Sequence, residues 1–307
     1  MTRRVLWHGL SVAGVLGASG AMAQAPVAIP EAPPEPAGPE SLAFSRDAAA
    51  RMTIPVMIDG QGPFAFVVDT GSDRTVISQE LAATLNLPLG PHVLLQESGG
   101  ADVVQTVVIS RLGIGERVVE GINAPVLAAV NLGAAGMLGI DSLRNQHIVI
   151  DFKGKALTSA PSQIVPDEPG TIIVKGRNHL GQLILMDSSV HGRTVYVIVD
   201  SGAEITVGNR ALQRLLSDYR GSDVYYPPTE VISVTGRRSP AELENIAEIH
   251  VGGLTIRNVP LAFADLHTFE RFDLADKPAM LLGMDVLSLC ARVTVDFRRR
   301  EASFTLN

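Results

Sequence analysis

The sequence contains little of what several structural and functional classes require. Its 307 residues include a single cysteine, Cys290, so no internal disulfide can form. The seven histidines show no H-E-x-x-H or other paired metal-ligand spacing, and no G-x-S-x-G stretch occurs. We therefore expect no metal, no cofactor and no serine nucleophile. Only 19% of the residues are charged and 46% are hydrophobic, which is enough apolar material for the cores of two domains.

Long apolar runs are also missing, except near the N-terminus. Arg3 and Arg4 precede a mostly apolar stretch, and Ala21-Met22-Ala23 fits a cleavage site. This pattern predicts a Sec-type signal peptide over residues 1–23. After its cleavage we expect a soluble periplasmic or secreted bacterial protein with no membrane span. The alternative is that residues 1–23 are not cleaved and serve as a membrane anchor. Without the two arginines, 23 basic residues face 32 acidic ones, a net charge of −9, which argues against nucleic acid or an anionic membrane as partner.

The rest of the chain has the texture of an all-β protein behind a short tether. Residues 24–40 are rich in proline and are expected to be an extended tether. From Ser41 onward, short β-branched and apolar runs alternate with Gly, Asn and Asp turns, which predicts an all-β fold. A turn-rich segment divides this region, and we assign two domains, residues 41–165 and 166–307.

The two β-rich regions repeat one pattern. FVVDTGSDRTVIS (66–78) matches YVIVDSGAEITVG (196–208), and Asp69 aligns with Asp200 at an offset of 131. Farther on, MLGIDSL matches LLGMDVL and IVIDF matches VTVDF. The same plan therefore occurs twice, with small insertions in the loops. SQELAATLNL and NRALQRLLSDY have helical apolar spacing, so we expect one short helix after each aspartate and a second after each later Leu-Gly pair.

Several features of the two copies recur together. Each Asp-hydroxyl-Gly follows an apolar strand, has Thr six residues after the Asp, and precedes a Leu-Gly pair, Leu138-Gly139 or Leu282-Gly283. In this joint pattern the chain resembles the retropepsin-like branch of the aspartic proteases, over nearly all of residues 50–305. The resemblance implies two tandem retropepsin-like β-barrel lobes related by pseudo-two-fold symmetry, and the activity of an aspartic endopeptidase.

The resemblance also implies which residues carry the chemistry. Asp69 and Asp200 would be the catalytic pair, because this class hydrolyses peptides with two carboxylates that share one proton. One carboxylate activates a water, and the other, protonated, polarises the scissile carbonyl. The substrate would be a polypeptide bound as an extended strand. The loops that support the pair would be formed by Thr70, Gly71 and Ser72 in one lobe and Ser201, Gly202 and Ala203 in the other, with Thr70 and Ser201 hydrogen-bonded across the lobe interface.

The residue after each glycine differs between the lobes. Ser72 can donate a hydrogen bond to a neighbouring carboxylate, whereas the side chain of Ala203 cannot. We therefore expect Asp69 to be the ionised partner and Asp200 to carry the shared proton. The other acidic residues that repeat between the lobes are interpreted as turn and cap residues: Asp141, Asp151, Asp285 and Asp296.

Each lobe also contains glycines in a hairpin pattern. Gly99 and Gly100 follow Ser98 in the first lobe, and Gly236 follows Thr235 in the second. These glycines are candidates for flaps that close over a substrate; ordinary surface hairpins fit the pattern equally well. The Tyr usual in flaps of pepsin-type enzymes is missing from both.

Alternatives to a single-chain enzyme are left open by the sequence. A catalytically silent peptide-binding protein of the same fold would explain Ser201 in place of Thr and the missing flap Tyr. Two intact aspartates favour the enzyme, since a silent relative has no reason to keep them. A monomer is expected, although lobes paired between two chains would also bring two aspartates together.

Overall fold

The computed structural model describes residues 40–47, 51–143, 146–161, 170–179, 182–217 and 228–306. The predicted signal peptide and nearly all of the proline-rich segment lie outside the described residues. All of the described residues belong to one compact unit, Ala37–Asn307. Within the described ranges, no helix is both long enough and apolar enough to cross a membrane.

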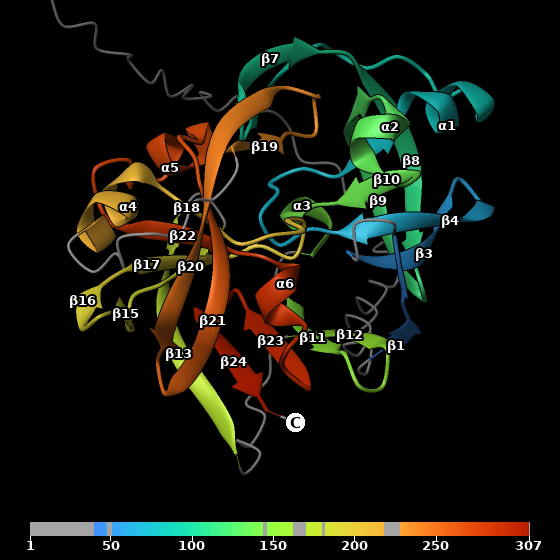
Figure 1. Ribbon diagram of the computed structural model, residues 1–307. Coiled ribbons are helices and arrows are strands. Elements are labelled where there is room, and N and C mark those ends of the chain that lie inside the picture. The colour runs from blue at the N-terminus through green and yellow to red at the C-terminus, as the bar shows by residue number, and fades with distance from the viewer. Residues whose placement is uncertain are drawn as a thin grey trace, which may run out of the picture. The chain divides into compact units, whose positions relative to one another are not determined.

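The first repeat forms a closed barrel of short strands (Figure 1). Seven strands follow the order β2-β3-β4-β10-β5-β9-β8, and a further pairing of β3 with β8 closes six of them into a ring. β6 and β7 form a separate two-stranded hairpin. The bounds are β2 Ser45–Arg46, β3 Met52–Ile58, β4 Gln61–Val68, β5 Val76–Ser78, β6 Val93–Glu97, β7 Gly100–Val104, β8 Thr106–Ile114, β9 Arg117–Leu127 and β10 Gly136–Leu138.

The second repeat has the same central arrangement. β17 pairs in parallel with β22, as β4 pairs with β10 in the first repeat. The strands follow the order β14-β17-β22-β18-β21-β20-β15-β16, and β19 pairs with β20. Their bounds are β14 Gln182–Leu185, β15 Ser188–Val190, β16 Arg193–Thr194, β17 Tyr196–Val199, β18 Val207–Gly208, β19 Pro228–Ile232, β20 Arg238–Val251, β21 Leu254–Phe263 and β22 Ala279–Leu282.

A third set of strands joins the two repeats. β11 of the first repeat pairs antiparallel with β23 of the second, for example Ile148 with Val295. The order in this part of the sheet is β1-β12-β11-β23-β24-β13, and these strands lie side by side in Figure 1. Their bounds are β1 Glu40–Ala43, β11 Gln146–Asp151, β12 Ala156–Pro161, β13 Thr171–His179, β23 Arg292–Asp296 and β24 Glu301–Thr305. The predicted boundary between the lobes, 165/166, lies outside the described residues.

The helices agree with the sequence at four positions and add two. α1 (Gln79–Thr84) and α4 (Arg210–Leu216) follow the aspartates as expected, and the side chains of Ser78 and Asn209 cap their N-termini. α3 (Ile140–Leu143) and α6 (Met284–Leu287) follow the Leu-Gly pairs. α2 (Ala129–Leu132) and α5 (His267–Arg271) were not predicted, because segments of about one turn have no readable apolar period. The described residues thus contain three short helices per repeat rather than one or two, and the predicted all-β, two-lobed architecture is confirmed.

Candidate active site

Both predicted aspartates stand where a buried central strand ends. Residues 66–68 of β4 are fully buried, and β17 ends at the buried Val199. The backbone N–H groups of Asp69 and Asp200 donate to the carbonyl oxygens of Leu138 and Leu282 at 3.0 and 3.1 Å. The Leu-Gly segments therefore fix the backbone of each aspartate.

Four hydrogen bonds join the two loops across the lobe interface. The Thr70 hydroxyl donates to the Val199 carbonyl, and the Ser201 hydroxyl donates to the Val68 carbonyl, both at 2.8 Å. Each hydroxyl also accepts the backbone N–H of the other residue at 3.1 Å. Thr70 and Ser201 are 1% and 0% exposed, so these bonds are shielded from water and an unmatched partner would be left unsatisfied.

The glycines at the centre of the loops allow the lobes to approach closely. A Cβ atom at Gly71 would lie 2.6 Å from the carboxyl carbon of Asp200. A Cβ atom at Gly202 would lie 2.5 Å from Oδ1 of Asp69. Any side chain at either position would therefore collide with the carboxyl group of the opposite lobe.

In each lobe, one threonine anchors the loop to a helix of the same lobe. Thr75 Oγ1 donates to Asp141 Oδ1 at 2.7 Å, and the backbone N–H of Thr75 donates to the same oxygen at 2.8 Å. Thr206 makes the corresponding bonds to Asp285, at 2.7 and 3.0 Å. The sequence suggested only turn and cap roles for Asp141 and Asp285, but in the structure they hold the loops that carry the aspartates. Asp151 and Asp296 do accept turn N–H groups, as expected.

Burial has the largest effect on the two carboxyl groups. Asp69 is 8% exposed, and loss of solvation raises its pKa well above the ordinary 3.8, with a further increase from the charge of Asp200. Loss of solvation also raises the pKa of Asp200, but backbone N–H groups and the hydrogen bond with Asp69 oppose that shift. The pair therefore favours holding a proton at a pH where an exposed Asp is ionised.

The hydrogen bonds to the two carboxyl groups differ from those expected from the sequence. The Ser72 hydroxyl donates to the Arg74 carbonyl at 2.9 Å rather than to a carboxylate. Asp69 accepts one backbone N–H in its own loop, at 2.7 Å, whereas Asp200 accepts two, at 3.0 and 3.2 Å. The expectation that Asp69 is the ionised partner relied on the side-chain donor at Ser72, and the structure does not place that donor on a carboxylate. The extra donor is instead the backbone N–H of Ala203, which reaches Asp200.

Residues that the sequence did not single out surround the pair. Arg51 is 8% exposed and lowers the pKa of both aspartates by its charge; its guanidinium is held by Asp47 and by the Leu132 carbonyl. On the other side, Gln182 of the second lobe donates to the Gly71 carbonyl. No motif signals these residues: Arg51 lies 18 residues before Asp69, and Gln182 lies 111 residues from Gly71, which it contacts.

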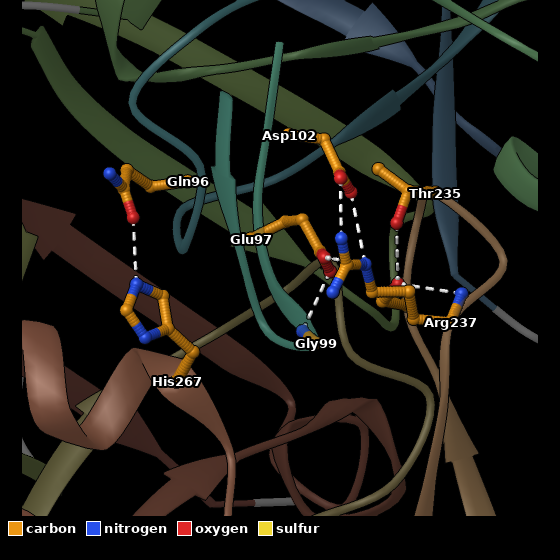
Figure 2. Close-up of polar contacts among 8 residues, drawn as sticks. Gln96, Glu97, Gly99, Asp102, Thr235, Arg237 and His267 are labelled. Carbon is orange, nitrogen blue, oxygen red and sulfur yellow. Dashed lines mark hydrogen bonds and ion pairs between the residues drawn. The ribbon is translucent and has the colours of Figure 1, made fainter. Parts of the chain in front are cut away.

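The first flap candidate is a hairpin that is attached to the second lobe. Gly99 and Gly100 lie at the tip of the first hairpin, β6–β7, and the Gly99 N–H donates to Glu97 at 2.7 Å. Figure 2 shows two attachments. Arg237 makes a paired hydrogen bond to the Asp102 carboxylate, and His267 of α5 contacts Gln96 at 2.7 Å. The His267 N–H also donates to the Ser98 carbonyl at 2.9 Å.

The second flap candidate makes the corresponding contact with the first lobe. Gly236 has φ +85° and lies in the turn of the second hairpin, β19–β20. A Cβ atom at Gly236 would lie 2.9 Å from Nδ2 of Asn131 in α2. Each hairpin thus reaches the unpredicted helix of the opposite lobe, α5 or α2.

A single cleft of about 980 Å³ is lined by both aspartates and by the tips of both hairpins. Its size and mixed lining suit a ligand larger than a single amino acid. Among the described residues, no group of three or more His, Cys, Asp or Glu could hold a metal ion. The carboxyl groups of Asp69 and Asp200 are among the polar groups that line the cleft.

Two family profiles match the chain in tandem. The profile described as gag-polyprotein putative aspartyl protease matches residues 54–145, and the profile described as aspartyl protease matches residues 186–286. The first range contains Asp69 and the first hairpin, and the second contains Asp200 and the second hairpin. Among curated proteins, none matches the chain.

The hydrogen bonds across the lobe interface should stabilise the fold. We expect Thr70→Val and Ser201→Ala each to lower the free energy of unfolding by about 1–3 kcal/mol, because each leaves a buried carbonyl and N–H without a partner. The double variant should lose less than the sum, since both residues belong to one network. Urea unfolding measures this. Ser72→Ala is the matched control and should change stability by less than about 0.5 kcal/mol; equal losses in all three single variants would contradict this account.

The ion pair between the hairpins should hold the first hairpin in place. We expect Arg237→Gln to speed amide hydrogen exchange in β6–β7 by about two- to fivefold, the range for an exposed ion pair. Asp102→Asn should have the same effect, and the double variant should exchange no faster than either single variant, because both substitutions remove the same ion pair. Arg238→Gln is the control, because Arg238 pairs with Glu230 inside its own hairpin. Unchanged exchange in the Arg237 variant would show that the contact does not restrain the hairpin.

Proposed function

Since the chain belongs to the retropepsin-like aspartic protease family, we propose that it is an exported endopeptidase that hydrolyses peptide bonds with Asp69 and Asp200. The observation that carries this proposal is the apposition of the two carboxyl groups, each packed against the glycine of the opposite loop. Asp69 is buried and Asp200 is partly buried. The two groups share a hydrogen bond and have raised pKa values, which supports a pair that holds one proton between them.

The unequal numbers of backbone donors suggest a role for each aspartate. Asp200, with two backbone donors, acts as the base that takes a proton from water as the water oxygen attacks the scissile carbonyl carbon. Asp69 gives its proton to the carbonyl oxygen, which forms a neutral diol. Asp200 then passes its proton to the leaving nitrogen as the C–N bond breaks, and a diol hydroxyl returns a proton to Asp69. The pair ends in its starting state.

The cleft lining supports a polypeptide substrate in extended form. Four exposed apolar side chains line it, from 36% to 87% exposed: Leu94, Val130, Ile205 and Ile232. They offer contacts for apolar residues flanking the cut bond, while hairpin edges offer backbone hydrogen bonds. Nucleic acid is disfavoured as a partner by the acidic balance of the chain.

Location and assembly are further parts of the proposal. The residues 1–23 pattern supports export to the periplasm or beyond. Both aspartates lie in one chain and their loops are bonded to each other, which supports a monomer as the active form.

Loss of either carboxyl group should abolish cleavage. Asp69→Asn and Asp200→Asn are nearly isosteric, and each should lower the cleavage rate of an unstructured protein by about 10²–10⁴-fold or more, because each removes one acid–base partner. Pepstatin inhibition of the unaltered protein is the companion measurement. A folded protein that binds peptides but cuts none would favour the silent peptide-binding alternative.

Stability should depend on pH through the buried pair. Because the folded-state pKa of Asp69 is raised, the pair stabilises the fold fully below the unfolded value near 3.8, and this contribution is lost as pH rises through the folded value. The side chain of Asn cannot ionise. The difference in the free energy of unfolding between the Asp69→Asn variant and the unaltered chain should therefore favour the variant more at pH 7 than at pH 4. Denaturant midpoints at the two pH values measure this. A difference that shrinks with rising pH would contradict the raised pKa.

Metal removal should leave cleavage unchanged, because carboxyl groups activate the water. Dialysis against a chelator, followed by the cleavage assay, tests this expectation. Loss of activity that added zinc restores would rule out the two-carboxylate mechanism as the whole account.

A further inference from the structure

Most charged side chains that line the cleft are neutralised by a partner. Asp47 pairs with Arg51, Glu230 with Arg238, and Glu97 lies 3.8 Å from Arg237. Asp73 pairs with Arg271, and Gln182 also faces it. Outside the catalytic pair, only Arg74 and Glu204 line the cleft without an ion-pair partner among the described residues, and both are exposed.

These two charges lie in corresponding loops of opposite lobes. Arg74 is five residues after Asp69, and Glu204 is four residues after Asp200. The repeat aligns Asp73 with Glu204 and Arg74 with Ile205. In the first lobe, Arg271 neutralises Asp73, so Arg74 is the charge left without an ion-pair partner among the described residues. In the second lobe, Glu204 is the charge left in this way, and the next residue, Ile205, is apolar.

The backbone that carries both charges is fixed. The carbonyl oxygens of Ser72 and Asp73 accept N–H groups from α3 at 2.8 and 3.2 Å, and those of Ala203 and Glu204 accept N–H groups from α6 at 2.9 and 3.1 Å. A positive and a negative group therefore stand at set positions on the two sides of the aspartate pair.

We propose that this cleft selects the direction and charge order of its peptide. The inference rests on the proposed endopeptidase function. A preferred substrate carries an acidic residue on the side of the cut bond that faces Arg74 and a basic residue on the side that faces Glu204. Apolar residues next to the cut contact the apolar lining.

Each ion pair between the peptide and Arg74 or Glu204 should contribute a small amount of binding free energy, and the two contributions should add. Exposed ion pairs contribute little singly, and salt weakens them. Reversing the charge order, however, replaces two attractions with two repulsions. We expect at least about a threefold preference in kcat/KM at low salt for one order over the other, with a smaller ratio at high salt.

The test compares peptides with the same apolar centre and composition. One set carries Asp before and Lys after the cut bond, the other the reverse, with charges two to four residues from the cut. The unaltered protein should prefer one order, and the double variant Arg74→Glu, Glu204→Arg should prefer the other. The single variants should each reduce the ratio. Arg257→Glu, which alters an exposed charge that pairs with Glu248 outside the cleft lining, is the control and should keep the original preference.

A binding measurement separates this inference from the proposed function. The affinity of Asp200→Asn protein for the same fluorescent peptides should show the same order preference, even if no peptide is cut. Binding with the preference but no cleavage would contradict the endopeptidase proposal and keep the charge selection. Equal binding and equal cleavage of both orders, or a preference that the double variant does not reverse, would overturn the charge selection alone.

Discussion

The exchange of hydrogen bonds between Thr70 and Ser201 is the contact on which the site depends. Each hydroxyl reaches the strand of the other lobe, so neither loop is satisfied alone. This exchange brings each glycine against the opposite carboxyl group. The burial that follows raises the pKa of both aspartates and creates the shared proton. The chemistry is therefore a property of the interface and of neither lobe separately.

The sequence predicted the parts of this arrangement that are local or repeated. Asp69, Asp200 and their glycines could be found because two copies of one pattern support each other, and α1 and α4 because apolar residues recur at helical spacing. Helices α2 and α5 could not be found, since about one turn carries no period. Arg51 and Gln182 were missed because their positions beside the loops depend on strand pairing between distant segments. The unequal backbone donors to the two aspartates could not be predicted, because backbone donors leave no trace in residue identity.

The two lobes share a plan but differ in their charges. The internal repeat explains the matching Thr75–Asp141 and Thr206–Asp285 anchors. A cleft built from identical halves would offer a peptide the same contacts in either of its two directions. Differences at Arg74 and Glu204, and unequal numbers of backbone donors to the aspartates, remove that equivalence. The lobes can therefore take different roles around one reaction centre.

The pairing of β11 with β23 has a consequence for how the protein is made. β11 belongs to the first lobe, but its partner is near the C-terminus, and β24 and β13 complete the same sheet. Contacts so distant along the chain form late, because loop closure between far segments is slow. A nascent chain that has emerged only through Asp69 contains one of the two paired aspartates, an open interface and an unfinished sheet. Such a chain lacks the second carboxyl group, so the paired site can form only once the second lobe has been made.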